Sequence, residues 1–360
     1  MSTNLPTPWR VPLLVLGMLS LVGGVVAGLI RMGWGVPLPG AASVLDHGPL
    51  MVCGFFGTVI SLERAVALGT GWAYLAPLCS GLGGLAVLVG AGAVAGPTLL
   101  LAGSLILLAA SLRVYFRQRA LHTLTLVLGA AAWAAGNALW LAGQVVPMVA
   151  PLWLAFLVIT IAGERLELSR FLPPSPVARG IFGAIMALML LGALSNFISW
   201  INGLPLFAAS LLALAIWLLR QDVARRTVRE QGLTRFIAVC LLSGYAWLAI
   251  GALIMLVTGM VPGSPGYDAG LHAIVLGFVF AMVFGHAPII FPAVLGVRLP
   301  YHTLFYGPLV VLHLSVAVRV VGALMALVPL RSAGGLLNAA ALVLFVLGMV
   351  SAAVRGSRGA

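Results

Sequence analysis

Charged residues are scarce in this sequence, because only 7% of its 360 residues are Asp, Glu, Lys or Arg. Hydrophobic residues make up 62% of the chain, and the mean hydropathy is +1.18. A chain with so few charges cannot cover a water-soluble surface. The composition therefore excludes a soluble globular protein and predicts an integral membrane protein, with the lipid bilayer as its solvent.

Cysteine and long polar segments are also scarce. Cys53, Cys79 and Cys240 are isolated within apolar runs, and no CxxC motif occurs, which is typical of small core residues without a redox or metal role. The longest polar stretch, 220–235, is too short to fold by itself. We therefore expect a single integral membrane domain over residues 1–360. Its first apolar run lacks a convincing small-residue cleavage site and is interpreted as a retained helix.

The apolar residues fall into about twelve runs of roughly 20 residues, the length that crosses the hydrocarbon core as a helix. This pattern predicts an all-α fold, a polytopic bundle of about twelve transmembrane helices. The predicted spans are 11–30, 43–66, 72–92, 97–116, 122–144, 147–167, 179–200, 203–220, 234–258, 267–294, 302–325 and 332–354.

Lysine is absent, so all 19 basic residues are arginine. On the predicted helices, all but Arg31, Arg319 and Arg331 lie on the side shared by the N-terminus and the even-to-odd connectors. Because basic residues stay on the cytoplasmic side of short loops, both termini are predicted to be cytoplasmic, in an inner membrane of bacterial type. This asymmetry and anionic lipid explain the net charge of +12 without a nucleic-acid partner.

Three predicted helices share sequence features at their ends. Spans 43–66 and 147–167 lead into FFGTVISLERAVALG and LVITIAGERLELSR, and spans 43–66 and 267–294 begin with DHGPLMVCGFF and YDAGLHAIVLGFVF. One interpretation is an internal repeat, with three sets of four helices in a pseudo-threefold arrangement. The other is that Glu–Arg at a helix end is simply a common solvated pair.

Two histidines lie within about two turns of the start of their predicted helices, His47 in the second span and His272 in the tenth. Neutral imidazoles at matching depth can form the axial pair of a b-type haem held between helices. Arg319, in the same half of the membrane, is a candidate for binding a haem propionate. Alternatively, Arg319 pairs with Asp46 or Asp268, or reaches the interface.

The other histidines lie lower in the predicted topology. His286 and His302 are placed at the cytoplasmic end and His313 near mid-membrane, and His122 is a further candidate neighbour. They could form a second metal or haem site or a proton path. The alternative is that each is an interfacial or hydrogen-bonded structural histidine.

The motifs HGPLMVCGFFG, HAIVLGFVFAM, Gly285–His286 and LHLSVAVRV, together with the twelve spans, resemble the NnrS family. That family is similar to subunit I of the haem-copper oxidases and is associated with haem, copper and nitric-oxide stress. The resemblance implies a pseudo-threefold arrangement and that His47 and His272 hold a low-spin haem. In the oxidase pattern a second histidine, two residues from the ligand on helix ten, serves the active haem, and three histidines on helices six and seven hold copper. This chain departs from that pattern, because position 274 is Ile and spans 147–167 and 179–200 contain no histidine. A conventional binuclear oxygen-reducing centre is therefore not expected, and copper is only weakly supported.

The sequence thus predicts a haem-binding membrane protein of nitric-oxide or redox metabolism, acting with a redox partner or a small gas ligand. Whether it catalyses a reaction is left open. A twelve-helix secondary transporter is the alternative, although all seven acidic residues lie at or near span ends, so the spans lack paired carboxylates. A structural or assembly subunit without cofactor is a third reading.

Overall fold

The computed structural model describes residues 4–37, 40, 43–169 and 174–358, with the side chains of 200–202 left out. Within these residues all regular structure is helical, and twelve helices are long and apolar enough to cross a membrane. This confirms the all-α prediction and makes the chain a multi-pass membrane protein. The elements are α1 (Thr7–Arg31), η1 (Val44–Asp46), α2 (His47–Pro49), η2 (Leu50–Phe56), α3 (Gly57–Leu68), η3 (Gly71–Tyr74), α4 (Leu75–Leu88), α5 (Ala95–Arg117), α6 (Leu121–Leu141), α7 (Val146–Leu168), α8 (Pro176–Ser195), α9 (Trp200–Gln221), α10 (Ala224–Thr227), α11 (Gly232–Thr258), α12 (Pro265–His272), η5 (Ala273–Phe280), α13 (Ala281–Leu295), η6 (Thr303–Phe305), α14 (Tyr306–Leu324) and α15 (Val328–Arg358).

Two predicted spans end earlier than expected. The span 72–92 ends at Leu88, because Gly90 adopts φ 66° in the left-handed region, where a helix terminates. The span 179–200 ends at Ser195, because the next residues form tighter i→i−3 backbone bonds that close the last turn. All other predicted ends lie within four residues of the observed ones.

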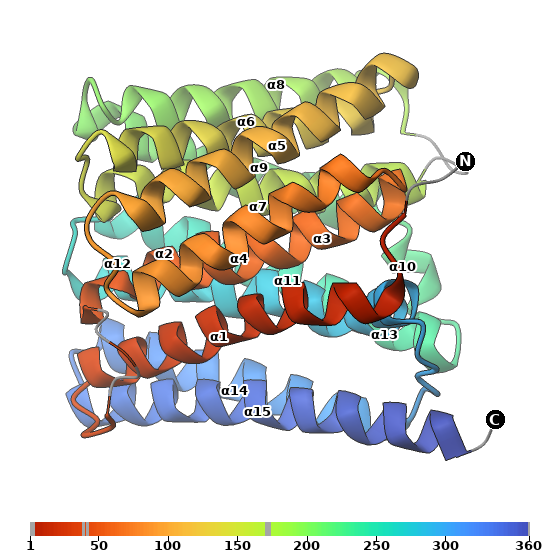
Figure 1. Cartoon of the computed structure of the whole chain (residues 1–360). Helices are drawn as coiled ribbons and strands as arrows, with labels where there is room; N and C mark the ends of the chain where they lie inside the picture. Colours follow the sequence, from red (N-terminus) through yellow and green to blue (C-terminus); the bar gives the residue numbers. More distant parts are fainter. Residues whose placement is uncertain (1–3, 38–39, 41–42, 170–173, 359–360) are drawn as a thin grey trace. The chain divides into compact units, whose positions relative to one another are not determined.

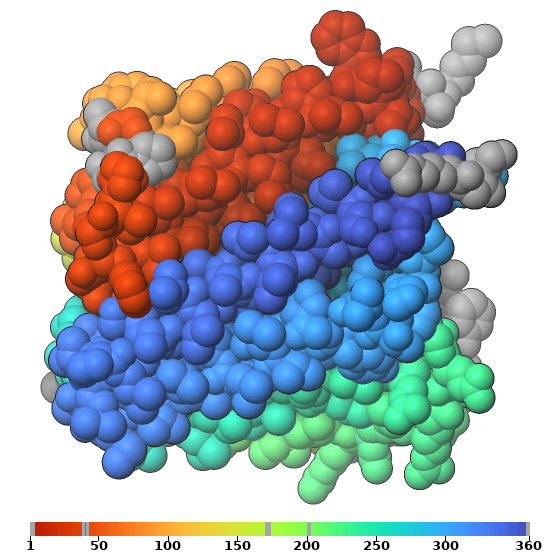
Figure 2. All heavy atoms as spheres, turned by 90° about the horizontal axis from the view of Figure 1, so that it is seen from below, coloured from red at the N-terminus to blue at the C-terminus, as the bar shows by residue number. Residues whose placement is uncertain are grey.

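The chain divides into two compact units. Unit 1 comprises Met1–Gly163 with Ala293–Gly296, and unit 2 comprises Glu164–Pro292 with Val297–Ala360, so α7 contributes to both. In unit 1, α1 packs on η2 and α4, α4 packs on α5, and α5 packs on α6 (Figure 1). In unit 2, α8 packs on α9, α9 on α11, and α11 on α12 and η5. Figure 2 shows α14 and α15 of unit 2 side by side. The pseudo-threefold arrangement and the single domain stay predictions.

A buried amide fixes the helix that carries His47 within unit 1. The side-chain oxygen of Asn137 accepts hydrogen bonds from the Trp153 indole N–H at 3.0 Å and the Cys53 thiol at 3.2 Å. Its Nδ2 donates to the carbonyl of Leu100 at 3.1 Å. Asn137 is fully buried, so these bonds are not shared with solvent. They join α5, α6, α7 and η2 at one point.

Candidate functional site

His47 lies at the start of the second span, where a capping box fixes the entry of the chain. The hydroxyl of Ser43 accepts the N–H of Leu45, and the carboxylate of Asp46 accepts the N–H of Ser43. The Nδ1–H of His47 donates to the carbonyl oxygen of Gly24 on α1, 2.7 Å away. A carbonyl can only accept, so the neutral ring carries its proton on Nδ1 and its lone pair on Nε2.

Glycine gives the His47 ring its access to α1. A Cβ placed on Gly28 would lie 3.0 Å from both Cε1 and Nδ1 of the imidazole. The ring therefore rests against the α1 backbone, at a place where any side chain would require it to move. Because Gly28 has no side chain, the ring can come close enough to α1 to reach the carbonyl of Gly24, one turn away.

His272 in unit 2 has the same tautomer for a similar reason. Its Nδ1 lies 2.8 Å from the carbonyl oxygen of Asp268, one turn earlier on α12, and 3.2 Å from the Asp268 carboxylate. Both groups accept hydrogen bonds, so the neutral ring carries its proton on Nδ1 and its lone pair on Nε2. A histidine that binds a metal through one nitrogen usually donates its other N–H to such an acceptor.

Arg319 lies beside this histidine and is paired with Asp268. Its Nη2 and Nε donate to the two carboxylate oxygens at 2.7 Å and 3.2 Å, and the arginine is only 7% exposed. The structure therefore realises the alternative in which Arg319 pairs with Asp268. Because the arginine already has an anionic partner, it does not need a haem propionate to balance its charge. The propionate assignment stays a prediction.

Both histidines are followed directly by an unusual helix. The segment η2 begins three residues after His47, and η5 begins immediately after His272; both are π-helical. The N–H that closes η2, from Gly57, donates five residues back to Val52. Such segments form well under 1% of residues in globular proteins and occur frequently at functional sites. This shared feature adds to the likeness between the second and tenth spans.

His313 has both ring nitrogens engaged. The indole N–H of Trp247 donates to Nδ1 at 3.0 Å, so the remaining proton lies on Nε2 and donates to the Ser243 hydroxyl at 2.9 Å. Ser243 in turn donates to the carbonyl of Val239 at 2.7 Å. Metal ligation by His313 would break one of these bonds, so the arrangement matches the structural alternative.

His302 and His286 differ in whether the lone pair of the ring accepts a hydrogen bond. The N–H of Leu304 donates to Nδ1 of the exposed His302 at 3.1 Å, so this ring caps η6 and its lone pair is used. His286 instead donates from Nδ1 to the Met282 carbonyl at 2.8 Å. Its Nε2 is shielded from solvent and has no hydrogen-bond partner among the residues that the structure describes.

The described part of the chain contains no group of three or more His, Cys, Asp or Glu side chains that could hold a metal ion. Of the three lower histidines proposed as metal ligands, only His286 has its lone pair on a nitrogen that is not already hydrogen-bonded. The meeting of His286 and His302 with His122 stays a prediction.

An ion-pair network in unit 2 was missed by sequence reasoning. Arg165 at the end of α7 donates from Nε and Nη2 to the two carboxylate oxygens of Asp222, at 2.8 Å and 3.0 Å. The Tyr245 hydroxyl donates to the same carboxylate at 2.6 Å, and so does the Ala224 N–H at 2.7 Å. Burial raises the pKa of Asp222, but Arg165, Tyr245 and Ala224 outweigh it and hold that pKa below its ordinary value.

Comparison with known proteins identifies a family. The model of a domain-of-unknown-function family, DUF8744, matches residues 10–354. No curated protein and no solved structure matches the chain.

Proposed function

The chain belongs to the DUF8744 family, and we propose that it is a haem-binding membrane protein in which His47 and His272 are the ligands to iron. The observation that carries the proposal is which nitrogen of each ring carries the proton. Each holds its proton on Nδ1 against a carbonyl acceptor, which leaves the lone pair on Nε2, the arrangement that a ligating imidazole needs. Each is also followed by a π-helical segment.

The residues present fit a b-type haem. Two neutral imidazoles are a common ligand pair for haem iron, and the missing side chain at Gly28 lets the ring of His47 rest against α1 in a fixed orientation. When bound, such an iron carries one electron at a time and can exchange it with a redox partner. The role of the chain's own residues is to fix the tautomer and orientation of each ring. That both rings ligate one iron is the prediction from the sequence.

The finer assignments belong to the same proposal. We place the protein in a bacterial-type inner membrane, in nitric-oxide or redox metabolism, as the resemblance to the NnrS family and the haem-copper oxidases implies. His302 and His313 use their lone pairs in hydrogen bonds, so they add no support for copper. His286 is the remaining candidate for a second ligand site.

A reduced-minus-oxidised absorption spectrum tests the proposal directly. Wild-type protein expressed with ample haem should show a six-coordinate low-spin spectrum, and His47→Ala or His272→Ala should abolish it because each removes one ligand. His302→Ala is the matched control and should retain the spectrum, since that ring caps a surface turn. Wild-type protein without any haem absorbance would refute the proposal and favour the transporter. A low-spin haem retained in both ligand variants would refute the ligand assignment.

A second prediction uses the glycine that seats His47. Gly28→Val should displace the imidazole, because even a Cβ at this position would lie 3.0 Å from the ring. We expect haem occupancy to fall about 10-fold or more, the scale seen when a residue that orients a metal ligand is lost. Gly183→Val on α8 is the control, since a Cβ there meets nothing within 4 Å. Equal haem occupancy in both variants would contradict the proposal that Gly28 positions the His47 ring.

A third prediction concerns orientation. A reporter fused after Ala360, or inserted near Arg226, should report the cytoplasm, and one inserted near Ser264 should report the periplasm. The reason is the arginine asymmetry between the two sides of the predicted helices. A cytoplasmic signal from the Ser264 insertion would overturn the placement of His47 and His272 in the periplasmic half.

A further inference from the structure

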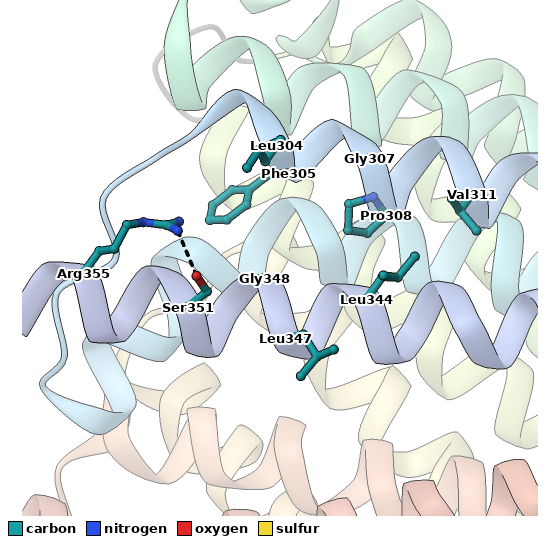
Figure 3. Close-up of a pocket in the computed structure, with 10 residues that line it drawn as sticks. All are labelled: Leu304, Phe305, Gly307, Pro308, Val311, Leu344, Leu347, Gly348, Ser351 and Arg355. Carbon is teal, nitrogen blue, oxygen red and sulfur yellow. Dashed lines mark hydrogen bonds between the residues drawn. The ribbon is translucent and has the colours of Figure 1, made fainter.

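A groove runs between α14 and α15 of unit 2, with a cavity volume of about 420 Å³ (Figure 3). Its sides are apolar: Pro308 and Val311 lie on α14, and Leu344 and Leu347 lie on α15. Leu344 is 45% exposed and Leu347 is 59% exposed, although they belong to a helix apolar enough to span a membrane. In a bilayer, side chains exposed on such a helix contact lipid.

Two glycines keep the groove open. Gly307 on α14 and Gly348 on α15 both line it. A Cβ built on either glycine meets no atom within 4 Å, so neither is required by close packing of the two helices. The absent side chains therefore leave space that a ligand can occupy.

One end of the groove is polar and basic. Arg355 lines this end and donates from Nη1 to the hydroxyl of Ser351, 2.8 Å away (Figure 3). Both residues are exposed. The next residue, Gly356, packs against the backbone of Arg298. This second arginine lies in the segment between α13 and η6, so that segment passes close to the same end of the groove. None of the described residues that line the groove is acidic.

We propose that this groove binds one anionic phospholipid, with an acyl chain along the apolar walls and the phosphate at Arg355 and Ser351. An amphiphile of this kind matches both parts of the groove, because the walls offer only dispersion and hydrophobic contact while the end offers a cation and a hydroxyl. Basic pockets between membrane helices attract anionic head groups, and each arginine near the surface contributes about 1 kcal/mol, or about fivefold in affinity. The proposal does not depend on haem.

The test is native mass spectrometry of the delipidated full chain in detergent, titrated with phosphatidylglycerol or phosphatidylcholine of identical acyl chains. The first phosphatidylglycerol should bind wild type about fivefold or more tightly than phosphatidylcholine. Arg355→Gln should weaken phosphatidylglycerol about fivefold and phosphatidylcholine by much less, because the choline cation offsets the charge of its phosphate. Gly348→Phe should weaken both lipids, because the ring fills the groove.

Arg117→Gln is the matched control, an exposed arginine in the last turn of α5 in unit 1. It should leave the first phosphatidylglycerol bound as in wild type. The proposal is overturned if wild type binds the two lipids equally, or if Arg355→Gln and Arg117→Gln weaken phosphatidylglycerol to the same extent. If Gly348→Phe does not fold, the two arginine variants decide the question, because both positions are exposed and the changes are small.

Discussion

Asp222→Ala is expected to lower the free energy of unfolding by roughly 3–5 kcal/mol, the usual cost of leaving one member of a buried ion pair without its partner. The Asp222 side chain is fully buried and that of Arg165 is 5% exposed, so water cannot replace the lost carboxylate. The Tyr245 hydroxyl, which is buried on α11, loses its acceptor as well. Denaturant titration in detergent, followed by circular dichroism, measures the loss.

Two further variants show whether the loss comes from the ion pair. In Arg165→Met/Asp222→Leu both charges are replaced by apolar groups, so much of the stability should return, since buried pairs often contribute little net stability. Glu230→Ala removes an exposed carboxylate and should change stability by less than about 1 kcal/mol. If Asp222→Ala is no more destabilising than Glu230→Ala, the ion-pair network around Asp222 does not hold α7 and α11 to the segment between α9 and α10.

The same carboxylate predicts a pH dependence. Its pKa in the folded protein lies below the ordinary value of 3.8, so the folded state favours the charged form. The stabilisation is therefore complete at pH values above 3.8 and is lost as the pH falls through the folded pKa. The stability difference between wild type and Asp222→Ala should be constant near neutral pH and shrink in strong acid. A difference that grows on acidification would contradict the lowered pKa.

The membrane spans could be predicted because the bilayer sets a length that apolar runs must meet. Interruptions were harder to predict: the helix around Leu88 ends early because Gly90 turns the backbone, and glycine is common inside membrane helices too. The π-helical segments after His47 and His272 left no signal, because an apolar run gives the same pattern for α and π geometry.

The candidate site could be predicted only in part. Depth along a helix selected His47 and His272, but the sequence could not say which ring nitrogen carries the proton, since the acceptor of His47 is a backbone carbonyl 23 residues away. Asp222 was missed for another reason. A charge at the end of a span is usually solvated, and only the tertiary structure reveals that Arg165 and Tyr245 enclose it.

Asp268→Asn is the second variant with a large expected effect, and it rests on the proposed haem. The carboxylate lies 3.2 Å from Nδ1 of His272, so with haem bound its charge would increase the electron donation of the ring and favour ferric over ferrous iron. If removing that charge weakens this preference 10- to 100-fold, the reduction potential rises by roughly 60–120 mV. Asp46→Asn is the control. Its carboxylate binds the N–H of Ser43, so its effect on the potential should be much smaller.

The single variant also leaves Arg319 buried without its bidentate partner, which lowers the stability of the protein. This loss of stability must be distinguished from a direct effect of the carboxylate on the reduction potential. Asp268→Asn/Arg319→Gln removes both charges and should recover much of the melting temperature lost in the single variant. If the carboxylate acts on His272, the potential stays raised in the double variant. If Asp268 serves only to hold Arg319, the potential returns toward wild type together with the stability. Wild-type protein without haem would refute the proposed function, whereas haem with an unchanged potential in both variants would refute only the tuning by Asp268.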